Sequence, residues 1–414
     1  MPGGCGGKPA AGAAERQPKP PMTNLTFSDF HLRLREFIRD QARQLPPDSD
    51  PEAEQIFSFL AQSLFDLQFR RNQPYQKYCQ ARDVTPGKIA HWKQIPALPI
   101  RAFKEMAVTS LASAERVFVF NSSGTTEQRP SSHFHDLESL KACEASLLPW
   151  FEAHFLAGWP CREKAKVMIP WNMIFLTPPP TLAPHSSLVH MFDTVGRKFG
   201  SKHSVFLGEI DPSGAWILNL AQIHRELREA VEARRMICLL GTAFNFVHLL
   251  DYLAERKMVF QLPQGSRVLE TGGYKGRTRA LPKSELHSLI RESLGVGADH
   301  IVCEYGMSEL SSQAYDRVVP VSSDEIQTDS RDQLRFERGV FQFPPWARAQ
   351  VISPETGREV GEGETGLIRI FDLANIRSVM AIQTEDLALR RGRGFELIGR
   401  ATLAEPRGCS LMVA

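Results

Sequence analysis

A run of small hydroxyl and glycine residues follows a strand-like segment at 116–121, whose sequence is RVFVFN. Its five members are Ser122, Ser123, Gly124, Thr125 and Thr126. Consecutive small residues let backbone N–H groups converge on one point, and the hydroxyls add donors without crowding an anion. The run is therefore a candidate site for the phosphates of a nucleotide. An ordinary polar turn after a strand would have the same composition, so the pattern alone leaves both interpretations open.

Three further polar stretches contain residues that could contact a nucleotide. They are ETGG at 270–273, YGMSE at 305–309 and TED at 384–386, the last followed by Gly399 and Arg400. Taken alone, Tyr305 would be interpreted as a core aromatic, and Asp386 with Arg400 as a surface ion pair. A G-x-G-x-x-G spacing at 361–366 precedes a strand instead of following one, so it predicts a β-turn and not a dinucleotide site.

The composition limits the class of protein that must position these stretches. The 414 residues are 42% hydrophobic and 23% charged, which predicts a globular protein with a large core. A net charge of +2 with dispersed Lys and Arg argues against a nucleic-acid partner. The longest apolar run, at 236–250, is too short and too polar to span a membrane. Without a charged and apolar leader segment, we expect a cytoplasmic protein.

Three regions are predicted along the chain. Residues 1–22 are rich in Gly, Ala and Pro and form a disordered tail. Residues 23–335 form an α/β core, because two amphipathic helices are followed by apolar runs that alternate with helical patterns, which favours largely parallel sheets flanked by helices. The expected core strands include 166–169, 236–240, 267–270 and 300–305. Residues 336–414 form a small β-rich subdomain with a hairpin at 386–399 and a tail that carries Cys409.

The order of the polar motifs resembles that of the adenylate-forming superfamily, which includes acyl-CoA synthetases, firefly-type luciferases and peptide-synthetase adenylation domains. The amino-acid sequences of six segments are similar to those found in LuxE-type acyl-protein synthetases. These segments are SSGTT, ETGGYKG, EYGMSELSSQAYD, DLANIRS, AIQTEDL and RGCSL, spread over residues 122–411. The resemblance implies a multilayer adenylate-forming fold that lacks the C-terminal lid domain. It also implies that a carboxylic acid, expected to be a fatty acid, reacts with ATP to give acyl adenylate and pyrophosphate. The acyl group would then pass through a cysteine to a reductase partner.

The resemblance assigns a role to each matching residue. Ser122, Ser123, Thr125 and Thr126, with Gly124 between them, would bind the β- and γ-phosphates of ATP. Ser308 would approach the α-phosphate, and Glu309 would offer Mg²⁺ a hard oxygen ligand. Tyr305, Gly306, Gly272 and Gly273 would flank the adenine, and Asp386 would accept the ribose hydroxyls beside Arg400. His133 resembles the histidine that follows the phosphate loop in LuxE-type chains, although a lone histidine is more often structural.

Cys409 is the candidate acyl carrier. It follows Arg407, whose charge would lower the pKa of the thiol, and a thiolate is a strong acyl acceptor. A passive thiol on a frayed tail is the structural alternative. Superfamily members that make CoA thioesters continue as a mobile lid with a catalytic lysine, and this chain is expected to use the tethered Cys409 in its place.

The other cysteines are expected to be small core residues. The seven cysteines have no C-x-x-C spacing, so neither a disulfide framework nor a zinc site is predicted.

The acyl pocket is expected near 239–246 and 184–191. Leu239, Leu240, Thr242, Phe244 and Phe246 resemble a pocket-lining segment of the superfamily, and the loop at 184–191 would close the pocket. Core packing explains the same residues equally well.

Two other functions remain open. One is a ligase of the phenylacetate-CoA ligase type that passes the adenylate to CoA or another soluble thiol. The other is a catalytically inactive scaffold for a reductase complex. Glu127 supports the scaffold because glycine is usual at this place in the phosphate loop, although Arg129 would supply positive charge there. The presence of Glu309, Asp386 and Arg400 opposes the scaffold.

Overall fold

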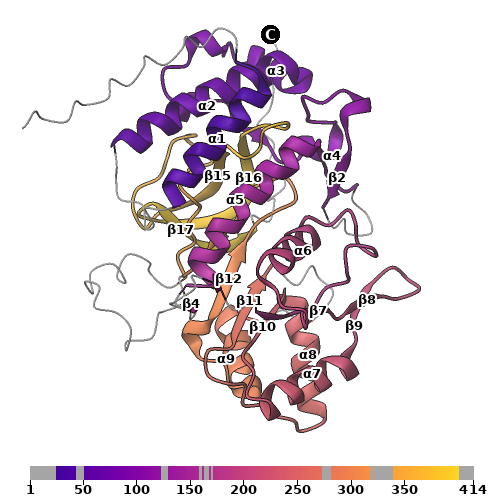
Figure 1. Cartoon of the computed structure of the whole chain (residues 1–414). Coiled ribbons are helices and arrows are strands. Elements are labelled where there is room, and N and C mark those ends of the chain that lie inside the picture. Colours follow the sequence, from indigo (N-terminus) through magenta and orange to yellow (C-terminus); the bar gives the residue numbers. More distant parts are fainter. Residues whose placement is uncertain are drawn as a thin grey trace, which may run out of the picture.

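The computed structural model describes residues 25–42, 51–122, 129–157, 161–162, 167–168, 171–272, 281–317, 319 and 339–400. Within these ranges a helical layer and two larger sheets make up most of the architecture (Figure 1). The predicted tail at 1–22 lies outside the described residues.

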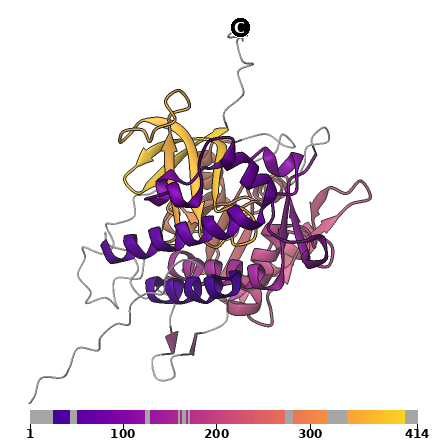
Figure 2. The same cartoon turned by 90° about the horizontal axis from the view of Figure 1, so that it is seen from above.

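The helical layer consists of α1 (Phe27–Ala42), α2 (Pro51–Arg71) and α3 (Gln73–Gln80). The two predicted N-terminal helices are thus confirmed. The buried side chains of α1 recur at helical spacing and include Phe30, Leu34, Phe37 and Ile38. The view from above shows these indigo helices next to the yellow C-terminal sheet (Figure 2). The Gln68 amide of α2 joins the two layers, since it donates to the carbonyls of Asn375 and Ile376 at 2.7 and 3.0 Å.

A six-stranded sheet has the order β13-β12-β11-β10-β6-β7. Its strands are β6 (Asn172–Phe175), β7 (Val205–Phe206), β10 (Ile237–Thr242), β11 (Arg267–Thr271), β12 (Ile301–Tyr305) and β13 (Ala314–Tyr315). Among these strands only β13 runs antiparallel to its neighbour. The prediction of a largely parallel sheet is confirmed.

Helices cover both faces of this sheet because successive side chains of a strand point to opposite sides. One face packs through Leu239, Val268 and Ile301 against α7 (Leu220–Glu232), α8 (Ala243–Glu255) and α9 (Lys283–Leu294). The other packs through Leu240, Leu269 and Val302 in the same core as α5 (Leu137–Phe155) and α6 (Ser187–Phe199). Because five of these strands run parallel, their carboxyl ends lie at the same edge of the sheet. Ligand-binding loops usually lie at this edge in α/β proteins.

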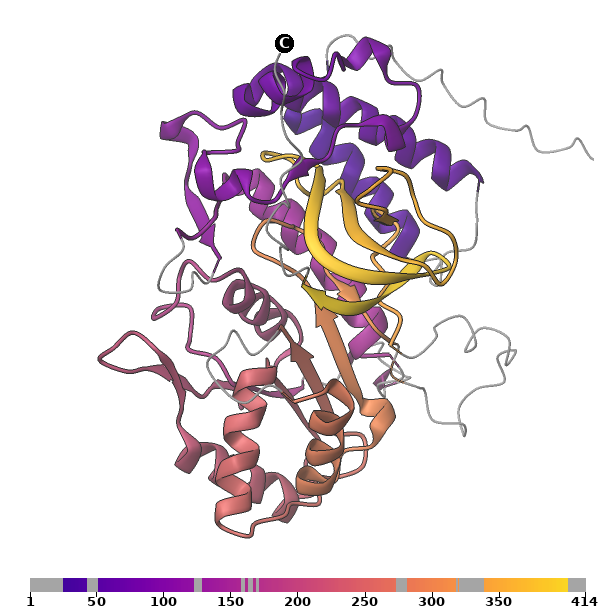
Figure 3. The same ribbon diagram turned by 180° about the vertical axis from the view of Figure 1, so that it is seen from behind.

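The C-terminal residues form most of a five-stranded sheet. Its strands are β1 (Leu98–Pro99), β14 (Ala347–Ile352), β15 (Thr365–Asp372), β16 (Ala381–Arg391) and β17 (Gly394–Arg400). Strands β14 to β17 pair antiparallel in succession, whereas β1 joins β16 in parallel. The predicted hairpin is confirmed, with Arg391 opposite Gly394 at its turn. Figure 3 shows this yellow sheet above the orange strands of the parallel sheet.

The remaining described elements are short. They are η2 (Pro86–Lys88), η3 (Trp92–Gln94), α4 (Ala102–Glu105), η4 (Ser113–Glu115), η5 (Ala298–His300), and the strand pairs β2 (Phe118–Asn121) with β3 (Ser132–His135), β4 (Cys161–Arg162) with β5 (Val167–Met168), and β8 (Gly208–Ile210) with β9 (Trp216–Leu218). No described helix is both long and apolar enough to cross a membrane.

Two local predictions are wrong. The strand expected at 166–169 pairs antiparallel with β4, and β6 takes its place in the main sheet. The loop expected at 184–191 includes the start of α6, because the Ser186 hydroxyl accepts a hydrogen bond from the Val189 N–H and caps that helix.

Candidate active site

Tyr305, Asp386 and Arg400 form a connected polar group at the junction of the two large sheets. The Tyr305 hydroxyl, at the end of β12, donates to an Asp386 carboxylate oxygen at 2.8 Å. Asp386 lies on β16 opposite Arg400 of β17, and the Arg400 Nε lies 3.5 Å from the other carboxylate oxygen. Three residues predicted to contact one nucleotide therefore meet, although they come from three strands.

The Tyr305 ring is held in an aromatic cluster. Its centroid lies 6.0, 6.2 and 5.2 Å from those of Phe341, Phe343 and Phe395. Burial raises the pKa of Tyr305 well above its ordinary value, and the neighbouring Asp386 charge adds to that rise. The hydroxyl therefore stays protonated and acts as a donor toward the carboxylate.

Two predicted glycines end neighbouring parallel strands. Gly272, which follows β11, has a φ of +67°, and no atom lies within 4 Å of where its Cβ would stand. Gly306 follows β12, and a Cβ there would lie 2.3 Å from Glu304 Oε1. The first glycine permits the turn, and the second permits the close approach of backbone and carboxylate.

Ser131 links the phosphate-loop candidate to Glu309. The Ser131 hydroxyl donates to Glu309 Oε1 at 2.5 Å, and its backbone N–H donates to the Ser122 hydroxyl at 2.9 Å. The Ser122 N–H in turn donates to the Ser131 carbonyl at 3.2 Å. Sequence reasoning missed Ser131. The only feature that could have pointed to it was its position two residues before His133.

Glu309 is a buried carboxylate with positive charges nearby. Burial raises its pKa, while the Ser131 hydrogen bond and the charges of Arg400 and Lys104 oppose that rise. Arg400 therefore acts electrostatically on Glu309 and is also beside Asp386. This shared arginine places the Glu309 group and the Asp386 group around the same region of the protein.

His133 supports Ser308 from within the core. It lies on β3 and is fully buried, and its Nδ1 lies 2.8 Å from the Ser308 carbonyl, which accepts the hydrogen bond. Burial lowers the pKa of His133 to about 4, so the ring is neutral at pH 7. These contacts favour a positioning role for His133 over proton transfer.

The DLANIRS segment, which sequence analysis quoted without giving its residues a role, fixes the loop after Glu309. Asp372 is fully buried and accepts hydrogen bonds from the N–H groups of Ser311 and Ser312 at 2.9 and 2.8 Å. Asn375 donates to the Glu309 carbonyl at 2.8 Å. The sequence feature that could have identified Asp372 and Asn375 is the presence of two polar residues within an otherwise apolar segment at the end of a strand.

The expected acyl-pocket segment has contacts typical of core packing. Leu239, Leu240 and Phe246 are fully buried, and Thr242 caps α8 through its hydroxyl. The Phe244 ring lies 4.5 Å from the His248 ring. The described residues thus give no separate reason to assign these side chains to a ligand.

Several predicted site residues lie outside the described residues. They are Ser123, Gly124, Thr125, Thr126, Glu127, Gly273 and Cys409. Of the cysteines expected in the core, Cys79, Cys143, Cys238 and Cys303 are buried and free.

The described part of the site combines three chemical functions. Asp386 offers two carboxylate oxygens as acceptors for neighbouring hydroxyls, Tyr305 offers a hydroxyl donor on a buried ring, and Glu309 offers a hard oxygen near two cations. Such a set suits hydroxyl groups of a ligand at Asp386 and a hard cation at Glu309.

Comparisons with known proteins identify relatives of this chain. A family model described as "Acyl-protein synthetase, LuxE" matches residues 190–414. The long-chain-fatty-acid–luciferin-component ligase of Vibrio harveyi is 22% identical over 371 residues, which are 88% of each chain. That of Aliivibrio fischeri is 21% identical over 376 residues, 88% of this chain and 89% of the relative.

A solved structure of 2-hydroxyisobutyryl-CoA ligase with 2-HIB-AMP, in the postadenylation state, has a TM-score of 0.57 at 13% identity. The match covers 86% of this chain and 72% of the other. The chain therefore has the fold of the adenylate-forming ligases, as predicted.

Proposed function

Because the chain belongs to the LuxE family of acyl-protein synthetases and is therefore a ligase, we propose that it joins a fatty acid to AMP and then holds the acyl group as a thioester on Cys409. The fatty acid is supported by the relatives in two bacteria, which are long-chain-fatty-acid ligases. A reductase that accepts the acyl group is the proposed partner.

The observation that carries the proposal is the contact of Tyr305 with Asp386, beside Arg400. In this proposal Asp386 accepts hydrogen bonds from both ribose hydroxyls, and Tyr305, Gly306 and Gly272 lie against the adenine. The bound nucleotide then presents its α-phosphate near Ser308 and Glu309. An oxygen of the fatty-acid carboxylate attacks the α-phosphorus, and the bond to pyrophosphate breaks with its electron pair leaving on the pyrophosphate oxygen.

Glu309 is the proposed ligand for Mg²⁺. Its carboxylate is buried and oriented by Ser131, and a single carboxylate together with substrate phosphates is a usual set of ligands for this ion. When bound, the ion neutralises charge on the phosphate oxygens. Ser131 keeps the Glu309 side chain in one orientation, and His133 holds the Ser308 backbone beside it.

The second step transfers the acyl group to sulfur. The Cys409 thiolate attacks the acyl carbonyl carbon, the bond to the AMP oxygen breaks, and AMP leaves with the electron pair. Tethering of the thiol to the same chain raises its concentration at the site. The thioester then supplies an activated acyl group to the reductase partner.

Two measurements on the full chain test the proposal. ATP–pyrophosphate exchange is measured across fatty acids of increasing length and across short aromatic acids, and covalent acylation is detected by intact mass with and without neutral hydroxylamine. The variants are Cys409→Ser and the adjacent control Ser410→Ala. We expect wild type and Ser410→Ala to exchange and to form a hydroxylamine-sensitive adduct, and Cys409→Ser to exchange without forming the adduct.

Other outcomes would contradict the proposal in distinct ways. Absence of exchange with every acid would indicate an inactive scaffold. Exchange followed by rapid acyl transfer to free CoA in Cys409→Ser would indicate a ligase for a soluble thiol.

A further inference from the structure

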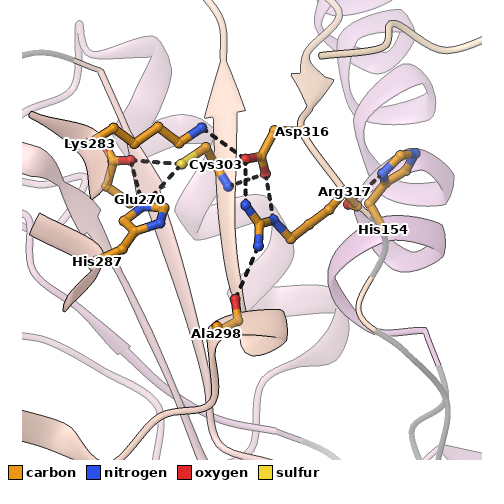
Figure 4. A network of polar contacts seen from close by, with 8 residues as sticks. All are labelled: His154, Glu270, Lys283, His287, Ala298, Cys303, Asp316 and Arg317. Atoms are coloured by element: carbon orange, nitrogen blue, oxygen red, sulfur yellow. Dashed lines mark hydrogen bonds and ion pairs between the residues drawn. The ribbon is translucent and has the colours of Figure 1, made fainter. Parts of the chain in front are cut away.

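Glu270, His287 and Cys303 converge between the parallel sheet and α9 (Figure 4). Glu270 on β11 and Cys303 on β12 are direct neighbours in the strand register, so their side chains point to the same face. His287 reaches them from α9. The Cys303 sulfur lies 2.9 Å from Glu270 Oε2 and 3.5 Å from His287 Nε2, and the last two atoms are 3.7 Å apart.

These separations suit a tetrahedral metal ion. Zinc binds sulfur at about 2.3 Å and imidazole nitrogen or carboxylate oxygen at about 2.0–2.2 Å, which places tetrahedral ligands roughly 3.3–3.6 Å apart. The sulfur–nitrogen distance of 3.5 Å falls within that interval. The nitrogen–oxygen distance of 3.7 Å is within a few tenths of an ångström of that interval. The sulfur–oxygen distance of 2.9 Å is shorter than a tetrahedral pair by roughly 0.6 Å, so the Glu270 side chain would have to rotate away from the sulfur when the ion binds.

The charges around the cluster also suit a cation. Glu270 is 7% exposed, and a buried carboxylate is costly unless a positive group accompanies it. Within the described part of the chain, the imidazole of His287 is the only basic group recorded at ion-pair distance from this carboxylate. The adjacent Lys283 donates to Asp316 at 2.8 Å and also interacts with the Cys303 thiol, so a metal ion bound to Cys303 would replace that second contact. Arg317 also pairs with Asp316.

We propose that Glu270, His287 and Cys303 bind one divalent transition-metal ion, and that zinc is the ion they select. One thiolate, one imidazole and one carboxylate are the ligand types that zinc prefers, whereas Mg²⁺ requires oxygen ligands. Thiolate and carboxylate together neutralise the charge of the ion. The three side chains leave one tetrahedral position for water or another donor.

The metal would have a structural role. It would tie β11, β12 and α9 together two residues before Gly272, where the chain turns toward the proposed adenine contact. Because the ligands come from three separate elements, no spacing in the sequence marks the site. The proposal does not depend on the acid, on Mg²⁺ or on Cys409.

The test uses the full chain in a Cys409→Ser background, so that the tail thiol adds no metal ligand. Zinc content is measured after loading and dialysis, zinc affinity by competition with a chelating dye, and thiolate ligation by the near-ultraviolet absorption of the Co²⁺-loaded protein. The variants are Cys303→Ser and His287→Gln. Cys238→Ser is the matched control, since Cys238 is a fully buried free thiol on the neighbouring strand β10.

We expect the parent protein and the Cys238→Ser variant to bind one zinc ion per chain and to show the thiolate-to-cobalt absorption. Cys303→Ser should lose that absorption, and His287→Gln should bind zinc at least about tenfold more weakly, as is usual when a metal site loses a supporting group. Zinc should also raise the melting temperature of the parent and not that of Cys303→Ser.

Absence of stoichiometric zinc in the parent protein would overturn the proposal, as would an unchanged cobalt spectrum in Cys303→Ser. If Cys303→Ser does not fold, His287→Gln decides the question, because His287 lies at the partly exposed side of the cluster. Zinc affinity equal to that of the parent in this variant would reject the site.

Discussion

The hydroxyl of Tyr305 donates to the carboxylate of Asp386 at 2.8 Å, across 81 residues of sequence. This bond joins the end of the parallel sheet to the antiparallel C-terminal sheet. A hydrogen bond therefore couples the position of the aromatic ring that we propose contacts the base to that of the carboxylate that we propose binds the ribose. A change on either residue is expected to affect the same ligand.

Replacement of Asp386 by Ala should weaken ATP binding strongly. Hydrogen bonds to a charged group contribute about 1.5–3 kcal/mol each, so loss of the two proposed ribose contacts should raise the KM for ATP in the exchange assay by at least about 100-fold. Tyr305→Phe keeps the ring and removes one hydrogen bond, so a rise of about fivefold is expected. Glu396→Ala, at an exposed position of β17, is the control. A wild-type KM in Asp386→Ala would exclude the ribose assignment.

Ser131 should set the pH at which Glu309 becomes protonated. Burial raises the pKa of Glu309, and the Ser131 hydrogen bond opposes that rise. In Ser131→Ala the pKa should therefore be higher still, so the exchange rate should begin to fall at a higher pH as the solution is acidified. Glu309→Gln should be nearly inactive at every pH because it cannot supply an ionised ligand. If the exchange rates of wild type and Ser131→Ala fall over the same pH range as the solution is acidified, this account is wrong.

Glu304 should make the fold less stable as the pH rises. Burial raises its pKa from 4.5 to about 7, so the folded state binds this proton more tightly than the unfolded state does. The contribution of this proton to the free energy of unfolding is fully present below pH 4.5 and is lost as the pH rises through 7. The difference amounts to about 3 kcal/mol. Urea unfolding between pH 5 and pH 8 should therefore show a smaller loss of stability in Glu304→Gln than in wild type. Parallel pH dependences in the two proteins would show that Glu304 ionises normally.

Asp372→Ala should destabilise the protein by about 3–5 kcal/mol, because it leaves several buried donors without an acceptor. These donors include the N–H groups of Ser311, Ser312 and Ala374. Asp372→Asn keeps the shape and one acceptor oxygen, so its free energy of unfolding should lie between those of wild type and Asp372→Ala. Equal stability of wild type and Asp372→Ala in urea titrations would show that this carboxylate is not the anchor of the loop.

The sequence was informative where a pattern was local. Helix α1 followed from apolar residues at helical spacing, and β10, β11 and β12 followed from short apolar runs between helical patterns. The hairpin of β16 and β17 followed from two strand-like segments around Gly392. Tyr305 and Asp386 were identified because each belongs to a short sequence motif, YGMSE and TED respectively, that resembles a motif of a known family.

The contacts that complete the site were not local, and sequence reasoning missed them. Ser131 and Glu309 lie 178 residues apart in the chain, and Ser312 and Asp372 lie 60 apart. Their roles depend on which strands become neighbours, and a single serine or aspartate carries no such information. The start of α6 was missed for a different reason: one proline and two serines at 184–187 are typical of a loop, whereas Ser186 caps a helix.

The parallel pairing of β1 with β16 has a consequence for biosynthesis. Leu98 finds its strand partner in Ile382, and the Gln68 amide finds its acceptor 307 residues further along. While the ribosome is still producing the middle of the chain, β1 lacks this strand partner and the Gln68 amide lacks its acceptors, so neither contact can form until nearly all of the polypeptide has emerged. Contacts of such long range slow folding, so we expect this part of the fold to form late.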